Sequence, residues 1–83
     1  MYHVYILQSL KSGRRYIGSA SNLERRLNEH NTGINPSTKN RGPFKVIYTE
    51  TFGTRKEAYK RELEIKSFRG GNKLKELLDR APR

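Results

Sequence analysis

Side chains that suit phosphodiester chemistry occur early in the chain, and an acid that could complete them comes later. The early groups are two phenols, a guanidinium and an imidazole, namely Tyr5, Tyr16, Arg26 and His30. A site that cleaves a phosphodiester also needs a carboxylate to hold a divalent metal against the phosphate. Glu62 is the candidate for that acid. The sequence therefore contains the groups for a metal-assisted hydrolytic site.

Two strands are predicted to carry the tyrosines. Residues 2–9 are rich in Tyr, Val, Ile and Leu, and residues 11–13 have the composition of a turn. A second strand is expected at residues 14–19. We expect the two strands to pair as an antiparallel hairpin, so that Tyr5 and Tyr16 lie on neighbouring strands.

A helix is predicted directly after the hairpin. Ser21 and Glu24 have the spacing of a capping box, and Leu23 and Leu27 have the spacing of a helical apolar face. The helix is expected to end near residues 31–33, where Asn, Thr and Gly follow one another.

The phase of this helix separates its two neighbouring arginines. At ~100° per residue, His30 falls on the apolar face and Arg26 on the flank of that face, whereas Arg25 points to the far side. Arg26 is therefore better placed than Arg25 to reach a site at the edge of the core.

A long loop and a third strand follow. Residues 31–43 have no apolar periodicity and include the cations Lys39 and Arg41, which suits a functional loop. Residues 44–52 alternate and predict a strand. The residues expected on one side of it are Phe44, Val46, Tyr48 and Phe52.

A second long helix is predicted from about residue 55 to residue 68. Thr54 and Glu57 have capping-box spacing at its start, and two glycines stop it at 70–71. Glu62 falls in the middle of its apolar arc, where an unpaired carboxylate would be costly. The arc is expected to consist of Ala58, Tyr59, Leu63 and Ile65. A short terminal helix with Leu74, Leu77 and Leu78 is expected to close the core.

The elements predict a fold of the α/β class (α+β type), with a small three-stranded antiparallel sheet flanked by helices in the order β-β-α-β-α-α. A length of 83 residues is expected to form one domain, residues 1–83. The absence of cysteine excludes disulfides and thiolate metal sites. No apolar run approaches the ~20 residues of a membrane span, and Met1 leads directly into a strand, so we expect a cytoplasmic protein.

The charge balance points to a polyanionic partner. Eighteen Lys and Arg residues against eight Asp and Glu give a formal net charge of +10. Such an excess destabilises a compact domain by self-repulsion, and nucleic acid is the leading partner that would relieve it. A generally basic protein is the alternative. An anionic membrane fits least, because the cations are spread over loops and both long helices.

The ordered set of motifs resembles the GIY-YIG nuclease domain, in particular its small stand-alone members similar to the nuclease module of excision-repair and structure-specific endonucleases. Tyr16-Ile17-Gly18 is identical to the second signature of the family, Tyr-Ile-Gly. Val4-Tyr5-Ile6 stands at the position of the first signature, Gly-Ile-Tyr, and only its tyrosine is carried over. The other motifs are Leu-x-x-Arg-Leu-x-x-His at 23–30, Ala-x-x-x-Glu at 58–62, Ile65-Lys66 and Gly-Gly-Asn-Lys at 70–73.

The resemblance implies a DNA endonuclease that acts in repair or recombination. It implies that Tyr5 and Tyr16 position or activate water, that Arg26 steadies the phosphate and that Glu62 binds a single Mg²⁺ or Mn²⁺ ion. His30 is either a further site residue or a hydrogen-bonded core residue. DNA contacts are expected from Arg26, Lys39, Arg41, Lys66, Asn72 and Lys73, and a partner protein could supply targeting.

Each assignment has a structural alternative. A tyrosine in a strand usually packs, Arg26 could be one more solvated cation, and Glu62 could pair with Lys66 at i+4. The alternative function is a nucleic-acid-binding module that keeps the basic surface and does not cut. A structural ribosome-associated protein is third.

Overall fold

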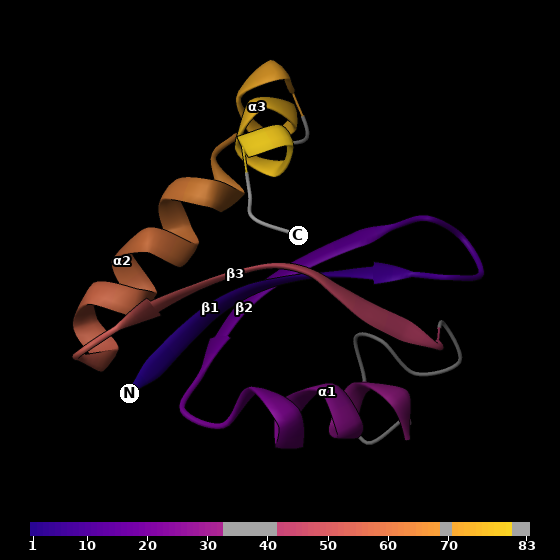
Figure 1. The fold of residues 1–83 in the computed structure, drawn as a ribbon, viewed down its shortest axis with the longest axis horizontal. Coiled ribbons are helices and arrows are strands. Elements are labelled where there is room, and N and C mark those ends of the chain that lie inside the picture. The colour runs from indigo at the N-terminus through magenta and orange to yellow at the C-terminus, as the bar shows by residue number, and fades with distance from the viewer. Residues whose placement is uncertain (33–41, 69–70, 81–83) are drawn as a thin grey trace.

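A computed structural model describes residues 1–32, 42–68 and 71–80. The elements are β1 (Tyr2–Ser9), β2 (Arg15–Ala20), α1 (Leu23–Asn31), β3 (Phe44–Phe52), α2 (Arg55–Lys66) and α3 (Asn72–Arg80). The α+β class and the order β-β-α-β-α-α are those that the sequence predicts. The strands form one antiparallel sheet in the order β2-β1-β3, so β2 is an edge strand. Helix α1 covers one face of the sheet, and α2 and α3 lie on the other side (Figure 1).

The central strand β1 supplies a core to each face. Val4 and Ile6 are fully buried in a cluster with residues of α2 and α3. Tyr5 and Leu7 point to the opposite face, where they cluster with Phe44 below α1. This division follows from the two-residue period of a strand. The sheet therefore lies between two small cores, and Tyr5 belongs to the one that α1 covers.

Strand β3 does not keep the single apolar side that its sequence predicts. Its pairing with β1 shifts register between Ile6 and Leu7, so that Tyr48 opposes Ile6 while Val46 opposes Leu7. This irregularity adds one residue on β3 and changes the face to which the following side chains point. Consequently Phe44 and Val46 pack on the α1 side, and Tyr48 and Phe52 pack on the α2 side.

Helix α1 begins one residue later than its predicted capping box. Asn22 is the cap, and its side-chain oxygen accepts a hydrogen bond from the Arg25 backbone N–H at 3.0 Å. Ser21 as the cap is therefore wrong, because asparagine at the adjacent position performs the same function. The helix ends at Asn31, as predicted. Asn31 also accepts a hydrogen bond from the backbone N–H of Phe44 at 2.7 Å, which ties α1 to β3.

Helix α2 is fixed to β3 by charge and to the core by a narrow apolar stripe. The Arg61 guanidinium donates two hydrogen bonds to the Glu50 carboxylate, at 2.9 and 3.0 Å. The predicted cap is confirmed, since the Thr54 hydroxyl accepts from the Glu57 backbone N–H at 3.2 Å. These contacts stabilise the start of α2 and hold its middle against β3.

The inner face of α2 is narrower than the predicted arc. Its buried residues are Ala58, Glu62 and Ile65, which follow one another at spacings of four and three. Tyr59 and Leu63 are 55% and 48% exposed, so their assignment to the core is wrong. Glu62 is buried, as predicted. No helix among the described residues is long and apolar enough to cross a membrane.

Candidate active site

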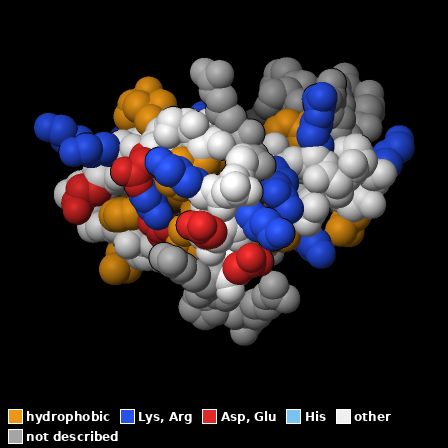
Figure 2. Space-filling view, turned by 90° about the horizontal axis from the view of Figure 1, so that it is seen from above, with side chains coloured by type: hydrophobic (Ala, Val, Ile, Leu, Met, Phe, Trp, Pro, Cys, Tyr) orange, Lys and Arg blue, Asp and Glu red, His pale blue; other side chains and the backbone are white. Residues whose placement is uncertain are grey.

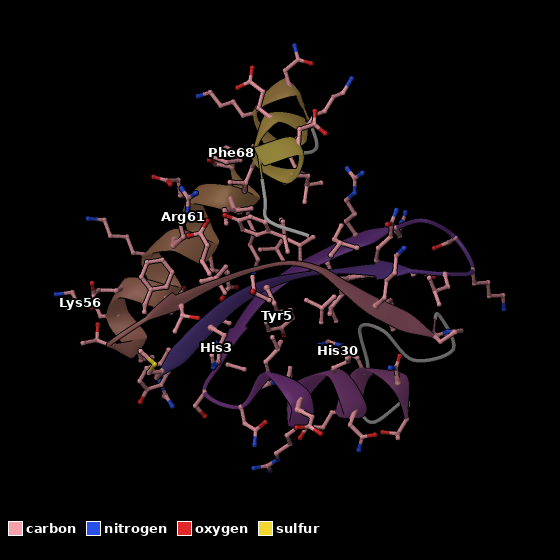
Figure 3. The ribbon with its side chains drawn as sticks, in the orientation of Figure 1. His3, Tyr5, His30, Lys56, Arg61 and Phe68 are labelled. Atoms are coloured by element: carbon pink, nitrogen blue, oxygen red, sulfur yellow. The ribbon has the colours of Figure 1, made fainter. Side chains whose placement is uncertain are left out.

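Tyr5 and His30 meet between the sheet and α1. The Tyr5 hydroxyl lies 3.4 Å from Nε2 of His30, and their rings pack edge to face with centroids 6.2 Å apart. Figure 3 shows both residues in the layer between β1 and α1. Both residues are buried, at 4% and 6% exposure. The helix phase predicted from the sequence for His30 is therefore confirmed.

Gly18 allows the Tyr5 ring to lie across the edge strand. Gly18 is the register partner of Tyr5 on β2. A Cβ atom at Gly18 would stand 2.5 Å from the Tyr5 hydroxyl oxygen and 2.8 Å from the ring carbon that carries it. Only a residue without a side chain permits this approach. The phenol consequently reaches the outer part of the sheet, next to β2.

We expect Gly18→Ala to destabilise the fold by about 1–3 kcal/mol, because a buried ring must move to admit the new methyl group. Gly53→Ala is the matched control, since a Cβ there has nothing within 4 Å. Its effect should stay within about 0.5 kcal/mol. Urea denaturation of both variants measures the difference. Equal changes in the free energy of unfolding would contradict this account of Gly18.

The Glu62 carboxylate lies on the other face of the same edge strand. It is 8% exposed and comes from the inner side of α2. The Ser19 hydroxyl donates to its Oε1 at 2.6 Å, and the Lys66 ammonium donates to its Oε2 at 2.6 Å. The i+4 pair with Lys66, which the sequence allowed as an alternative, is therefore present together with a contact to the sheet.

Arg25 and Arg26 differ in exposure as their helix phase predicts. Their side chains are 78% and 41% exposed, respectively. Each guanidinium Nε lies near the Glu29 carboxylate, at 3.4 Å for Arg25 and 3.7 Å for Arg26. The two arginines thus share one acidic partner and differ in how far they turn toward the sheet.

The two faces of the sheet meet at a groove, which we name the edge groove, at the end of β2. It has a volume of about 640 Å³. Its described lining residues come from β1, β2, the start of α1 and the first half of α2; they are Tyr2, Ser19, Ala20, Ser21, Arg26, Arg55, Lys56, Ala58 and Tyr59. The groove therefore brings Arg26 into the same cavity as Ser19, the residue that holds Glu62.

The electrostatics of Tyr5 reflect this arrangement. Burial raises the pKa of Tyr5 above its usual value, the Arg26 guanidinium opposes the rise, and the Glu62 and Glu29 carboxylates add to it. Burial also lowers the pKa of His30, and Arg26 lowers it further, against the opposing effect of Glu29. At neutral pH the pair is consequently a protonated phenol beside a neutral imidazole.

The lowered pKa of His30 predicts an acid-sensitive fold. The unfolded chain takes up a proton at His30 near pH ~6.5, whereas the folded chain takes it up only at a lower pH, so stability falls as the pH falls below ~6.5. The slope from this residue is at most ~1.4 kcal/mol per pH unit. Subtracting the unfolding curve of His30→Gln from that of the wild type between pH 5 and 7 (approximate range) isolates the contribution. A difference independent of pH would contradict it.

Tyr16 lies apart from this cluster. Its ring packs edge to face on Phe44, with centroids 5.4 Å apart. Its hydroxyl is buried and has no hydrogen-bond partner among the residues that the structure describes. Such a group is costly unless a function or another molecule compensates for it. The packing role that the sequence allowed for Tyr16 is thus present, and its role in catalysis stays a prediction.

The remaining predicted DNA contacts are dispersed. Lys66 pairs with Glu62, whereas Asn72 and Lys73 are exposed on the first turn of α3 and are not among the described lining residues of the edge groove. Lys39 and Arg41 lie outside the described residues. Figure 2 likewise shows Lys and Arg side chains spread over the visible face, with Asp and Glu among them.

The residues present fit a metal that keeps most of its water. Among the described residues, no group of three or more His, Cys, Asp or Glu side chains could hold a metal ion. Mg²⁺ commonly uses one or two carboxylates and takes its other ligands from water and substrate phosphates. Glu62 can supply one such carboxylate, and the hydroxyl that orients it belongs to Ser19, a lining residue of the edge groove.

The sequence did not identify Ser19, Arg55 or Tyr59 as residues of the candidate site. The two-residue period of β2 places Ser19 on the face opposite Gly18, which is a signal that could have paired it with the helix carrying Glu62. Arg55 and Tyr59 line the edge groove because Ala58 and Ile65 of the same helix pack on β1 in the core. No local pattern specifies where on the sheet the helix docks.

Comparison with known proteins gives consistent matches along almost the whole chain. A relative from Staphylococcus saprophyticus, named a UPF0213 protein, is 43% identical over 75 residues and covers 89% of this chain and 90% of its own. A UPF0213 protein from Halobacterium salinarum is 37% identical over 67 residues, with 80% and 86% covered.

A solved structure agrees with the fold. The solution NMR structure of a UPF0213 protein from Bacillus halodurans is 35% identical in sequence to this chain and has a TM-score of 0.52. The match covers 94% of this chain and 82% of that protein. The model of the GIY-YIG catalytic domain matches residues 1–75, which include every described candidate residue of the site. The chain therefore belongs to the GIY-YIG catalytic domain family.

Proposed function

We propose that this protein is a divalent-metal-dependent endonuclease that hydrolyses DNA phosphodiester bonds, with water as the nucleophile. Membership of the GIY-YIG family supports nuclease chemistry. The observation that carries the proposal is that Arg26 lines the edge groove together with Ser19, whose hydroxyl donates a hydrogen bond to the Glu62 carboxylate. A cation for the phosphate and an acid for a metal are the two groups that hydrolysis of a phosphodiester requires.

Glu62 would hold one Mg²⁺ or Mn²⁺ ion, with Ser19 fixing the direction of its carboxylate. When bound, such an ion withdraws charge from the phosphoryl oxygens and stabilises the transition state. The neighbouring Lys66 ammonium donates to Oε2 and holds the carboxylate in place.

Arg26 would bind the phosphate oxygens through its planar guanidinium. A guanidinium offers several N–H donors in a geometry that matches phosphate. Its half-buried partner Glu29 lies at 3.7 Å, a loose contact that a phosphate can replace. Arg26 thus contributes positive charge where the transition state accumulates negative charge.

Tyr5 and His30 would position water and move a proton. Burial raises the pKa of the Tyr5 phenol, so the group stays protonated at neutral pH and can take up a proton only if it gives its own away. In the tautomer with its proton on Nδ1, neutral His30 accepts from the Tyr5 hydroxyl at Nε2. Tyr5 can then take a proton from water while it passes its own to His30, which avoids a free phenolate.

A non-catalytic nucleic-acid-binding module is the second candidate. The net charge of +10 favours DNA binding under either function. The buried acid favours hydrolysis, since a protein that only binds a polyanion gains nothing from a carboxylate beside its phosphate site. We place the activity in DNA repair or recombination, on the resemblance to the nuclease modules of those pathways.

A cleavage assay distinguishes these functions. Purified protein is incubated with end-labelled branched and linear DNA, with Mg²⁺, with Mn²⁺ or with EDTA. The proposal expects cut products with either metal and none with EDTA. Binding without any cut product, across all these DNAs and both metals, would support the binding module instead.

A further inference from the structure

We propose that Tyr59 forms a stacking platform for an unpaired nucleotide of DNA within the edge groove. This inference rests on the proposed function and names the class of substrate: DNA with unpaired bases next to the bond that is cut. The phenol ring of Tyr59 is 55% exposed and stands on the outward side of α2. It lines the edge groove together with Arg26, the arginine expected to bind the scissile phosphate.

The other walls of the groove complement a nucleic-acid strand. Three of its described lining residues are cations, Arg26, Arg55 and Lys56, and no described lining residue is acidic. Arg55 lies over the ring of Tyr2, with its guanidinium carbon 5.8 Å from the ring centroid. Lys56 extends outward from the first turn of α2 (Figure 3). Cations beside exposed aromatic rings are the combination that binds single strands, with phosphates on the charges and bases on the rings.

The geometry favours an unpaired base over a duplex. Bases within a duplex are stacked on their neighbours and have no free π-face for a protein ring. A groove of about 640 Å³ falls within the size range of pockets that enclose a small molecule, which suits one nucleotide. Because the same groove contains Ser19 and Arg26, a nucleotide stacked on Tyr59 would place its neighbouring phosphate at the candidate active site.

An exposed tyrosine on a helix is often of no consequence, and Leu63 provides the comparison. Leu63 is 48% exposed on the same helix, one turn further on, and does not belong to the described lining of the groove. If general apolar exposure governed DNA binding, Tyr59 and Leu63 would behave alike. If the groove governs it, only Tyr59 matters.

Equilibrium binding in EDTA tests this without cleavage. The probes are a fluorescein-labelled single-stranded oligonucleotide, the matching duplex, and a strand of the same length without bases, all at one fixed salt concentration. Tyr59→Ala should weaken binding of the single strand about 5- to 150-fold, the range for loss of one stacked base. Tyr59→Phe should bind as the wild type does. Duplex binding should change less than about twofold, because paired bases offer no face to the ring.

The baseless strand separates stacking from charge. It keeps the phosphates, so it should bind the wild type weakly and be indifferent to Tyr59→Ala. Leu63→Ala should leave all three affinities unchanged. Equal loss on single strand and duplex, equal loss on the baseless strand, or the same loss from Leu63→Ala would overturn the platform.

The outcome is separable from that of the proposed nuclease activity. Loss of single-strand affinity in Tyr59→Ala supports the platform even if no DNA is cut. Conversely, the protein could cut DNA with Mg²⁺ while Tyr59→Ala binds single strands as tightly as the wild type. That result would support the nuclease assignment and overturn the platform. Because the chain contains no tryptophan, its tyrosine fluorescence gives a second readout, in which Tyr59 is quenched by a stacked base.

Discussion

Glu62→Gln is expected to reduce metal-dependent cleavage by about 10³-fold or more, the scale of effects on losing a charge-stabilising group in phosphoryl transfer. Glutamine keeps the shape of the side chain and the acceptor for the Ser19 hydroxyl. It removes the negative charge that a hard divalent cation requires. Single-turnover cleavage of a labelled DNA, with Mg²⁺ varied, measures the loss.

The fold of Glu62→Gln should survive with a small loss of stability. The carboxylate is held by Ser19 and by Lys66, whose side chain is 49% exposed, so the ion pair that is lost contributes about 0–1 kcal/mol. An acid surrounded by apolar groups alone would instead have made the variant more stable. The wild type should gain about 2.7 kcal/mol when Mg²⁺ is present at 100 times its Kd, and Glu62→Gln should gain nothing.

Glu64→Gln is the matched control for this experiment. Glu64 lies two residues further along α2, has a side chain that is 56% exposed, and pairs with Arg61. Its neutralisation also removes an ion pair, but it leaves the edge groove unchanged. Normal cleavage by Glu64→Gln beside an inactive Glu62→Gln isolates the role of the buried acid. A Glu62→Gln protein that still cuts DNA would refute the site as described.

Arg26→Ala is expected to lower the rate of cleavage by about 10³-fold, whereas Arg25→Ala should lower it less than about threefold. The two residues are chemically identical and pair with the same Glu29, so truncating either one removes a similar contact from α1. Only Arg26 lines the edge groove with Ser19. Comparing the two variants therefore tests the effect of the position of the arginine, because the side chain removed is the same in both.

Binding and turnover should separate in these variants. Arg26→Ala should retain most of its affinity for DNA in EDTA, because many other cations contribute to a net charge of +10. Its defect should appear in the single-turnover rate with saturating protein. If both variants lose the same amount of activity, the contribution of arginine is general electrostatic attraction, and the assignment of Arg26 to the scissile phosphate is wrong.

The local pattern of the sequence determined the elements and their order. The apolar composition of β1, the alternation of β3, the leucine spacing of α1 and the capping residues of α2 each act within a few residues of the chain. For this reason the helix phase that buries His30 and turns Arg26 toward the sheet could be read directly. The burial of Glu62 could be read in the same way, since it follows Ala58 at i+4.

The tertiary structure decided what local patterns leave open. A one-residue irregularity in β3 divides the apolar side chains of that strand between the two cores. Whether the irregularity stabilises the fold depends on how the side chains pack on both faces of the sheet. Helix α2 docks through Ala58 and Ile65 on the distant strand β1, and this docking leaves Tyr59 exposed in the edge groove.

The site itself shows the same division. The sequence by itself determined which residues could perform phosphodiester chemistry, because side-chain type and local periodicity are properties of short segments. Only the tertiary structure decided that Tyr5 and Glu62 lie on opposite faces of one edge strand, with Gly18 and Ser19 as their respective contacts. The physical reason is that strand pairing and helix docking depend on contacts between distant segments, and their energies are fixed only when the whole core is packed.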